Sequence, residues 1–229
     1  MQTIMDWIGV ELDPVSWTEK FVSVLGGVAA ILLIVTISQH ALHLTGSSML
    51  IASMGASAVL LFAVPHGQLS QPWPVVAGHL FSAVIGVTCA KLLPYPPLAA
   101  ACAVGLSIGV MHQFKCIHPP GGATALTAVI GGEGVQQLGY EFVWSPVALN
   151  VIVIVAVAVA FNYLFQWRKY PASLNRRQKS PALSQEISHD EVVAALRRLD
   201  SFVDVTEDDL VRLYHILSTN HAVNRTVSK

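Results

Sequence analysis

Charged side chains are scarce in this sequence. Only 12% of its 229 residues are Asp, Glu, Lys or Arg, whereas about a quarter is usual in a soluble domain. Between residues 21 and 166 the formally charged side chains are Lys91, Lys115, Glu133 and Glu141. Such a stretch excludes an ordinary water-soluble fold, and a formal net charge of −1 gives no basis for binding nucleic acid. The sequence therefore predicts a polytopic membrane protein whose main partner is the lipid bilayer.

Cysteine pairs and catalytic motifs are also missing. The three cysteines include no CxxC pair, which argues against a disulfide framework and against a structural zinc site. No Ser-His-Asp, His-Glu-x-x-His or paired-carboxylate arrangement is present, and the glycines match neither a P-loop nor a dinucleotide-binding fingerprint. We therefore expect no metal, no cofactor and no enzymatic activity.

Long apolar runs, in contrast, are abundant. Residues 1–20 are acidic, contain two tryptophans and are predicted to lie at the membrane surface. The membrane domain is predicted at residues 21–167, with full spans at 21–44, 75–93, 98–114 and 144–167 and with shorter apolar segments at 47–64 and 115–132.

The two short segments share a sequence repeat. Gly55-Ala56-Ser57-Ala58-Val59 in the first recurs as Gly122-Ala123-Thr124-Ala125-Leu126 in the second. The repeat predicts an all-α fold of two similar halves, each consisting of a span, a short or re-entrant helix and a span. If both short segments re-enter from the outer face, the chain has four full spans. If both cross completely it has six, and the halves are inverted, as in many transporters.

Basic residues follow the last span. Because cytoplasmic flanks carry an excess of Lys and Arg, this cluster predicts a cytoplasmic C-terminus in a cell inner (plasma) membrane; it comprises Arg168, Lys169, Arg176, Arg177 and Lys179. Residues 168–187 are predicted to form a basic linker, and residues 188–229 a pair of amphipathic helices. A pair of this size buries too little surface to fold alone. We expect it to pack on the membrane domain or on another subunit of a homo-oligomer.

The motif with the clearest chemistry begins at Lys115 and continues through His118, Pro119 and Pro120. Pro119 favours an extended conformation at His118, so a helix that arrives here should break. A new short helix can begin at Pro120 or Gly121, because proline suits a first helical turn. Its free amides and positive dipole end would face the membrane interior, which predicts an anion-binding site.

The candidate ligands to such an anion come from both halves. Lys115 and His118 would supply positive charge, and amides or hydroxyls would come from Gly121, Gly122, Thr124, Gly55 and Ser57. Other interpretations are open for each: Lys115 can end its helix at the interface and extend to water, His118 can be a structural histidine, and the small residues can serve helix packing.

The motifs resemble the HPP family of integral membrane proteins. His118-Pro119-Pro120 followed by Gly-Gly-Ala-Thr-Ala-Leu is similar to the family's signature, and residues 53–66, 71–72 and 78–79 are similar to its first-half pattern. The resemblance implies four transmembrane segments and, from chloroplast and cyanobacterial members, nitrite transport. Some members carry CBS domains after the membrane region. The short helical pair that we expect at residues 188–229 would leave no room for them, so regulation through such domains is not expected.

We therefore expect passage of a small inorganic anion, nitrite first, through a site formed by broken-helix N-termini. If His118 is the main cation, uptake should rise as the pH falls through about 6 to 7, and entry with a proton becomes possible. The alternative is a membrane sensor or scaffold whose C-terminal helices recruit a partner.

Overall fold

The computed structural model describes residues 16–41 and 52–177, and all regular structure in these ranges is helical. The helices are α2 (Trp17–Ala41), α3 (Ser53–Ala63), α4 (Pro72–Leu92), α5 (Pro96–Gln113), α6 (Pro119–Ile130), α7 (Glu133–Leu138) and α8 (Leu149–Tyr163). A π-helix, Val143–Ala148, leads directly into α8. The predicted all-α fold is confirmed for these residues, whereas the predicted C-terminal helical pair lies outside them.

Three helices are long and apolar enough to cross a membrane, namely Trp17–Gln39, Pro72–Leu92 and Val143–Tyr163. The predicted span at residues 98–114 is also a helix, α5, of 18 residues. It falls outside that group because it opens with two prolines and closes with His112 and Gln113, which lower its mean hydropathy. Together with the apolar composition, these helices identify a multi-pass membrane protein.

The first helix begins within the segment that the sequence assigned to the membrane surface. The hydroxyl of Ser16 accepts a hydrogen bond of 3.1 Å from the amide of Glu19. A serine followed three residues later by Glu is a typical helix N-terminus. The helix therefore starts at Trp17 and not at residue 21.

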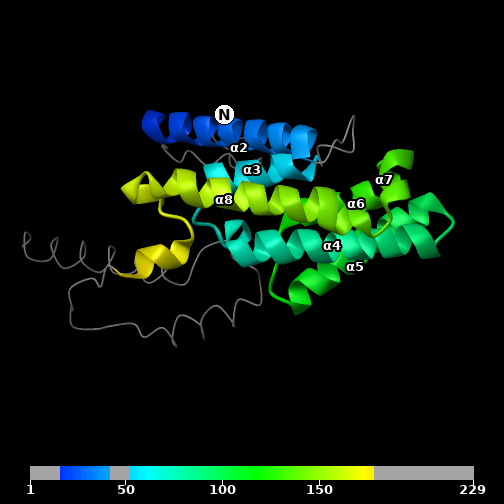
Figure 1. The fold of residues 1–229 in the computed structure, drawn as a ribbon. Helices are drawn as coiled ribbons and strands as arrows, with labels where there is room; N and C mark the ends of the chain where they lie inside the picture. The colour runs from blue at the N-terminus through cyan, green and yellow to red at the C-terminus, as the bar shows by residue number, and fades with distance from the viewer. Residues whose placement is uncertain (1–15, 42–51, 178–229) are drawn as a thin grey trace, which may run out of the picture.

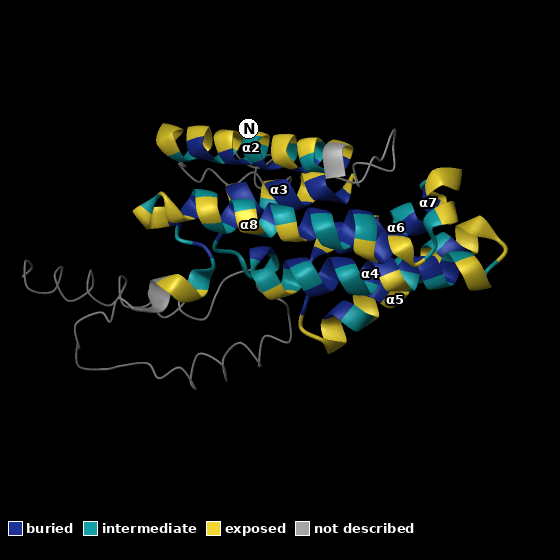
Figure 2. Ribbon diagram, viewed as in Figure 1, coloured by how far each residue is buried: buried dark blue, intermediate teal, exposed yellow. Residues whose placement is uncertain are grey.

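The long helices α2, α8, α4 and α5 form a stack in the view of Figure 1, and each of them contacts the next. Helix α4 contacts α5, α6 and the π-helix, and α2 packs on α3 and α8. The outward face of α2 is largely exposed (Figure 2), and between Phe21 and Leu33 its exposed side chains are apolar. In a membrane protein such a face fits contact with lipid chains.

Arg168 joins three helices at one end of this stack. Its guanidinium donates to the carbonyl of Phe62 at the end of α3 and to Oδ1 of Asn162 on α8. It also donates to Glu19 and Ser23 near the start of α2. Burial lowers the pKa of Arg168, and the charge of Glu19 raises it. The start of α2 and the ends of α3 and α8 therefore lie together.

The start of α4 and the end of α5 lie at this same end. The amide of Ala172, just after Arg168 in the chain, donates to Oε1 of Gln71 over 3.0 Å, and Gln71 immediately precedes α4. In the first turn of α4, Nε1 of Trp73 donates to the carbonyl of Phe114 over 3.0 Å. Phe114 is the C-cap of α5.

The helices therefore alternate in direction: α2 and α4 start at the Arg168 end, whereas α3, α5 and α8 finish there. A re-entrant α3 would have returned the chain to the opposite end before α4 began. This geometry favours the six-crossing alternative, in which the halves are inverted, over the four-span arrangement. The number of crossings and the duplication itself remain predictions.

Candidate functional site

The predicted helix break at His118 is present. Helix α5 ends at Gln113 and α6 begins at Pro119, one residue earlier than expected. His118 is the N-cap of α6, in an extended conformation with φ −143° and ψ 98°. Proline at the first two positions of α6 costs no helical hydrogen bond, since N–H groups there have no partner within the helix.

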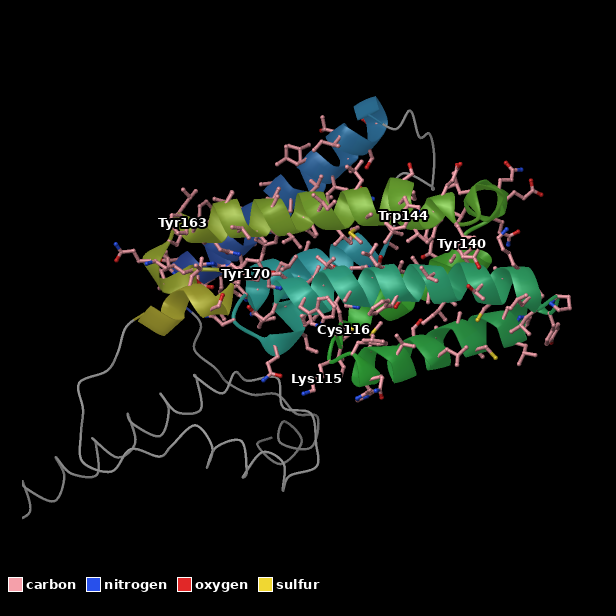
Figure 3. The ribbon with its side chains drawn as sticks, turned by 60° about the horizontal axis from the view of Figure 1, so that its bottom comes forward. Lys115, Cys116, Tyr140, Trp144, Tyr163 and Tyr170 are labelled. Carbon is pink, nitrogen blue, oxygen red and sulfur yellow. The ribbon has the colours of Figure 1, made fainter. Side chains whose placement is uncertain are left out.

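Lys115 directly follows Phe114, the C-cap of α5. The φ of Lys115 is +52°, the left-handed conformation that usually requires glycine. The amide of Lys115 donates to the carbonyl of His112 over 3.2 Å, and that of Cys116 donates to Met111 over 2.9 Å. This pair of bonds is a Schellman motif, which satisfies free carbonyls at a helix end. Lys115 is exposed and lies at the edge of the helical body (Figure 3), so its side chain lies outside the buried site described next.

A buried network of two imidazoles and three hydroxyls lies where α3, α4 and α6 meet. Ser57 Oγ on α3 is 2.8 Å from Nε2 of His79 on α4 and 2.9 Å from Nε2 of His118. Nδ1 of His79 is 2.7 Å from the hydroxyl of Thr124 on α6, which is 2.8 Å from that of Ser53. The four side chains of Ser57, His79, His118 and Thr124 are 0% exposed. Charged side chains are rare in this membrane domain, so this buried group of two imidazoles and three hydroxyls is the candidate functional site.

Glycines bring the backbones of α4 and α6 close enough to form the network. A Cβ added at Gly78 would lie 2.8 Å from Cβ of His118, and one at Gly121 would lie 2.7 Å from the carbonyl oxygen of Gly78. Further along the same crossing, a Cβ at Gly86 would lie 2.6 Å from the carbonyl oxygen of Ala125. Gly121, one of the predicted ligands, thus has a packing role, as the alternative interpretation held.

The two copies of the repeat contribute equivalent hydroxyls. Ser57 and Thr124 occupy the third position of each five-residue copy. They hydrogen-bond the two different ring nitrogens of His79. The ring of His118 also lies against that of His79, with the centroids 4.9 Å apart. Of the predicted ligands, the structure therefore brings together His118, Ser57 and Thr124.

Other predicted ligands lie outside the network. Gly55 is exposed and Gly122 is half-buried. The amide of Gly121 already donates to the carbonyl of His118 over 2.8 Å. Since Pro119 and Pro120 have no N–H group, the start of α6 presents fewer free amides than the sequence suggested.

His79 and Ser53 were missed by the sequence analysis. His79 stands within an otherwise apolar 21-residue span, and an ionisable residue inside a span indicates a functional site by default. That signal was available in the sequence. Ser53 offered none, because its bond to Thr124 joins residues 71 positions apart.

A separate pocket of about 240 Å³ lies near the other end of α4. Lys91, Gln136 and Gly139 are among its lining residues, and none of the predicted ligands is. The buried network is therefore closed in this conformation, and the pocket is not part of it.

Comparison with known proteins gives a consistent result. The family model described as "HPP, transmembrane region" matches residues 12–171. Two transmembrane proteins of Dictyostelium discoideum are 36% and 32% identical to the chain over 185 and 184 residues. Each match covers 75% of the chain, but only 57% and 62% of the respective relative, so the chain spans about three fifths of their length. No solved structure matches the chain.

Proposed function

We propose, from the premise that this chain belongs to the HPP family of membrane proteins, that it carries a small inorganic anion across the membrane. Nitrite is the first anion to test, a choice that rests on the family resemblance. The observation that carries the proposal is the position of Ser57 Oγ, which lies within 2.9 Å of one ring nitrogen each of His79 and His118. An oxygen atom is thus held between two imidazoles inside the membrane domain.

An anion oxygen placed at the position of Ser57 Oγ would have two ring nitrogens in hydrogen-bonding reach. If the pair of rings carries one added proton, both nitrogens can donate, and bonds from an ionised donor are roughly twice as strong as neutral ones. Thr124 and the positive end of α6 would add to the favourable field. The buried surroundings strengthen each of these interactions, because water does not compete.

Further polar atoms lie beyond the network, on α4 and at the start of α8. Ser82, three residues after His79 on α4, and Asn150 at the start of α8 are both buried. Among the described residues, Ser82 Oγ and Asn150 Nδ2 have no hydrogen-bond partner. Buried polar atoms are usually paired, so such atoms are natural contacts for a polar ligand that passes toward the end of the bundle remote from Arg168.

Transport requires the closed network to open. Ser57 comes from the short helix α3, whereas His79 and His118 lie on the glycine-packed pair of α4 and α6. Movement of α3 relative to this pair would withdraw the hydroxyl and leave its position to the anion. Such rocking of one element against a fixed site is the usual basis of alternating access.

Uptake of nitrite, nitrate, formate and chloride into proteoliposomes tests this function. Ser57→Ala should reduce uptake of the transported anion by roughly tenfold or more, because the empty carrier would have to close on two imidazoles that have lost the hydroxyl between them, and loss of a buried hydrogen-bond partner costs about 1–3 kcal/mol. Ser107→Ala is the matched control: Ser107 is equally buried, but its hydroxyl donates to Ala103 within α5. Equal uptake by both variants would remove Ser57 from the site, and equal uptake by wild type and His118→Ala would remove His118.

A further inference from the structure

The hydrogen bonds around the two buried imidazoles have a fixed direction, which the carbonyl of Leu69 sets. A carbonyl oxygen only accepts, so Nδ1 of His118 carries the proton of the 2.8 Å bond to Leu69. In the neutral ring, Nε2 of His118 is then an acceptor. Its partner Ser57 must therefore donate the hydroxyl proton to it.

The same reasoning continues from Ser57 to the start of α3. Because Ser57 has used its proton, its oxygen accepts from Nε2–H of His79. Nδ1 of the neutral His79 ring then accepts from Thr124, and Thr124 accepts from Ser53. In the order of donation the chain reads Ser53, Thr124, His79, Ser57, His118 and Leu69.

This chain of hydrogen bonds follows α3 along much of its length. Ser53 is the first residue of α3. Leu69 lies near its other end, since the hydroxyl of the next residue, Ser70, donates to the carbonyl of Leu60 over 3.0 Å. The chain of hydrogen bonds therefore runs parallel to α3 toward the Arg168 end of the bundle, and a proton path across the membrane domain requires a component in this direction.

An added proton can pass between the two rings without any other reactant. When His79 is protonated on both nitrogens, Thr124 can donate to the carbonyl of Pro120, 3.4 Å away. The Nε2–H bond of His79 then breaks as its proton passes to Ser57 Oγ, and the Ser57 O–H bond breaks as its own proton passes to Nε2 of His118. His79 is left neutral with a proton on Nδ1, Ser57 is again a hydroxyl, and His118 carries the charge.

The surroundings of the rings favour a single added proton. Helices α3 and α6 and the π-helix carry no Asp, Glu, Lys, Arg, His or Cys, and the ring packed against His79 is that of His118. Two positive charges at a centroid separation of 4.9 Å would repel. Other titratable groups on α4 and on the segments around it, among the described residues, include Cys89 and Lys91 on α4, His66 before it, Tyr95, Cys102 and His112 on or beside α5, Lys115 and Cys116 after α5, Tyr140 beside Thr88, and Tyr163 on α8.

We propose that His79, Ser57 and His118 bind and relay one proton, and that the transported anion crosses together with this proton. The coupling between anion and proton rests on the proposed function, because it requires that the protein transports an anion. The proton site itself rests on the direction of the hydrogen-bond chain.

Two transport assays separate proton coupling from anion passage. Exchange of isotopically labelled nitrite at equal pH needs no net proton movement, whereas accumulation driven by an acidic exterior does. His79→Gln keeps an amide donor for Ser57 but cannot hold a proton. Because His79 also belongs to the proposed anion site, the variant is compared with its own exchange: at nitrite concentrations where its exchange is measurable, its accumulation should still fall to the level of protein-free liposomes. His112→Gln, which alters an exposed histidine on α5, should retain both activities.

Accumulation by His79→Gln at the wild-type level would overturn the relay. If the wild-type protein exchanges none of the anions tested, the proposed function fails. The proton site is then tested by itself, by measuring the protonation of the histidine rings with ¹⁵N NMR of histidine-labelled wild-type protein in lipid nanodiscs. As the pH falls within the range in which the protein stays folded, one ring of the pair should become protonated on both nitrogens. If both rings stay neutral throughout, or if both become charged, the proposal is overturned. Because this measurement uses the wild-type protein, it holds even where a variant fails to fold.

Discussion

At the scale of single residues, small side chains determine how the site is assembled. The close approaches at Gly78, Gly86 and Gly121 all join α4 to α6. Any side chain at these positions would separate the two helices. His79 lies on α4 and Thr124 lies on α6. Their hydrogen bond therefore depends on the close approach of the two helices at these glycines, although the glycines take no part in the bond.

Gly86→Ala should therefore destabilise the protein. The added Cβ would lie 2.6 Å from the carbonyl oxygen and 2.9 Å from Cα of Ala125. Both are backbone atoms, which cannot move away by a change of side-chain rotamer. Overpacking of this kind costs about 1–3 kcal/mol, so the thermal midpoint in detergent micelles should fall by several degrees. At Gly105 no atom lies within 4 Å of an added Cβ, so Gly105→Ala should leave the midpoint unchanged or raise it. Equal midpoints for the two variants would contradict this account.

The sequence predicted part of the buried network and missed the rest for a physical reason. His118, Ser57 and Thr124 could be singled out because they interrupt apolar segments beside prolines or small residues. Which side chains meet depends on the packing of three helices, and no local pattern encodes it. His79 was the exception, since a histidine inside a span is itself a signal.

At the scale of helices, the local chemistry of helix ends is readable from sequence, and the contacts between helices are not. The Pro119–Pro120 pair predicted the start of α6 to within one residue. The sequence left open that Lys115 ends its helix, but the positive φ of Lys115 was not predicted, because a lysine in that conformation is uncommon. Lys115 looked like a ligand from its charge alone.

Arg168 was predicted as part of a basic linker, yet it holds three helices together. Arg168→Gln should therefore lower the free energy of unfolding by about 3 kcal/mol, because removing one partner leaves the other polar groups without their donor. The side chain of Arg168 is 1% exposed and that of Glu19 is 23% exposed, so water compensates only partly for the loss.

Denaturant unfolding in micelles measures this difference. Lys169→Gln is the matched control, since it removes a neighbouring cation that is only half-buried. Midpoints that agree between the two variants would show that the contacts of Arg168 do not join the helices in solution.

At the scale of the whole molecule, membrane topology was the least predictable property. The positive-inside rule separates four spans from six only through Lys91 near the end of α4, which lies on the same side as the basic cluster if there are four spans and on the other side if there are six. Helix direction favours six crossings more strongly, because it depends on the complete path of the chain. A single sequence holds no comparable signal.

Cysteine accessibility tests the crossing number. In a background with Cys89, Cys102 and Cys116 replaced by Ser, we introduce Val64→Cys or Gln166→Cys, both at exposed positions. With six crossings, a membrane-impermeant maleimide should label both from the same face of sealed vesicles. With four spans, it should label them from opposite faces.

Glu133→Cys is the reference for the other face, because Glu133 is exposed and lies beyond α6. It should react from the face opposite to Gln166→Cys in either arrangement. The assignment of the C-terminus to the cytoplasm, which rests on the basic cluster, is read from the same labelling in vesicles of known orientation.

The depth of His79 has an electrical consequence. His79 is seven residues past Pro72 in a 21-residue helix, which places it about 10 Å along a helix of about 31 Å. A lone proton that reaches it from the Arg168 end would cross about a third of the membrane voltage, worth roughly 0.8 kcal/mol per 100 mV. A proton that travels with a monovalent anion carries no net charge. Loading of the empty carrier would therefore respond to voltage, while translocation of the filled carrier would not.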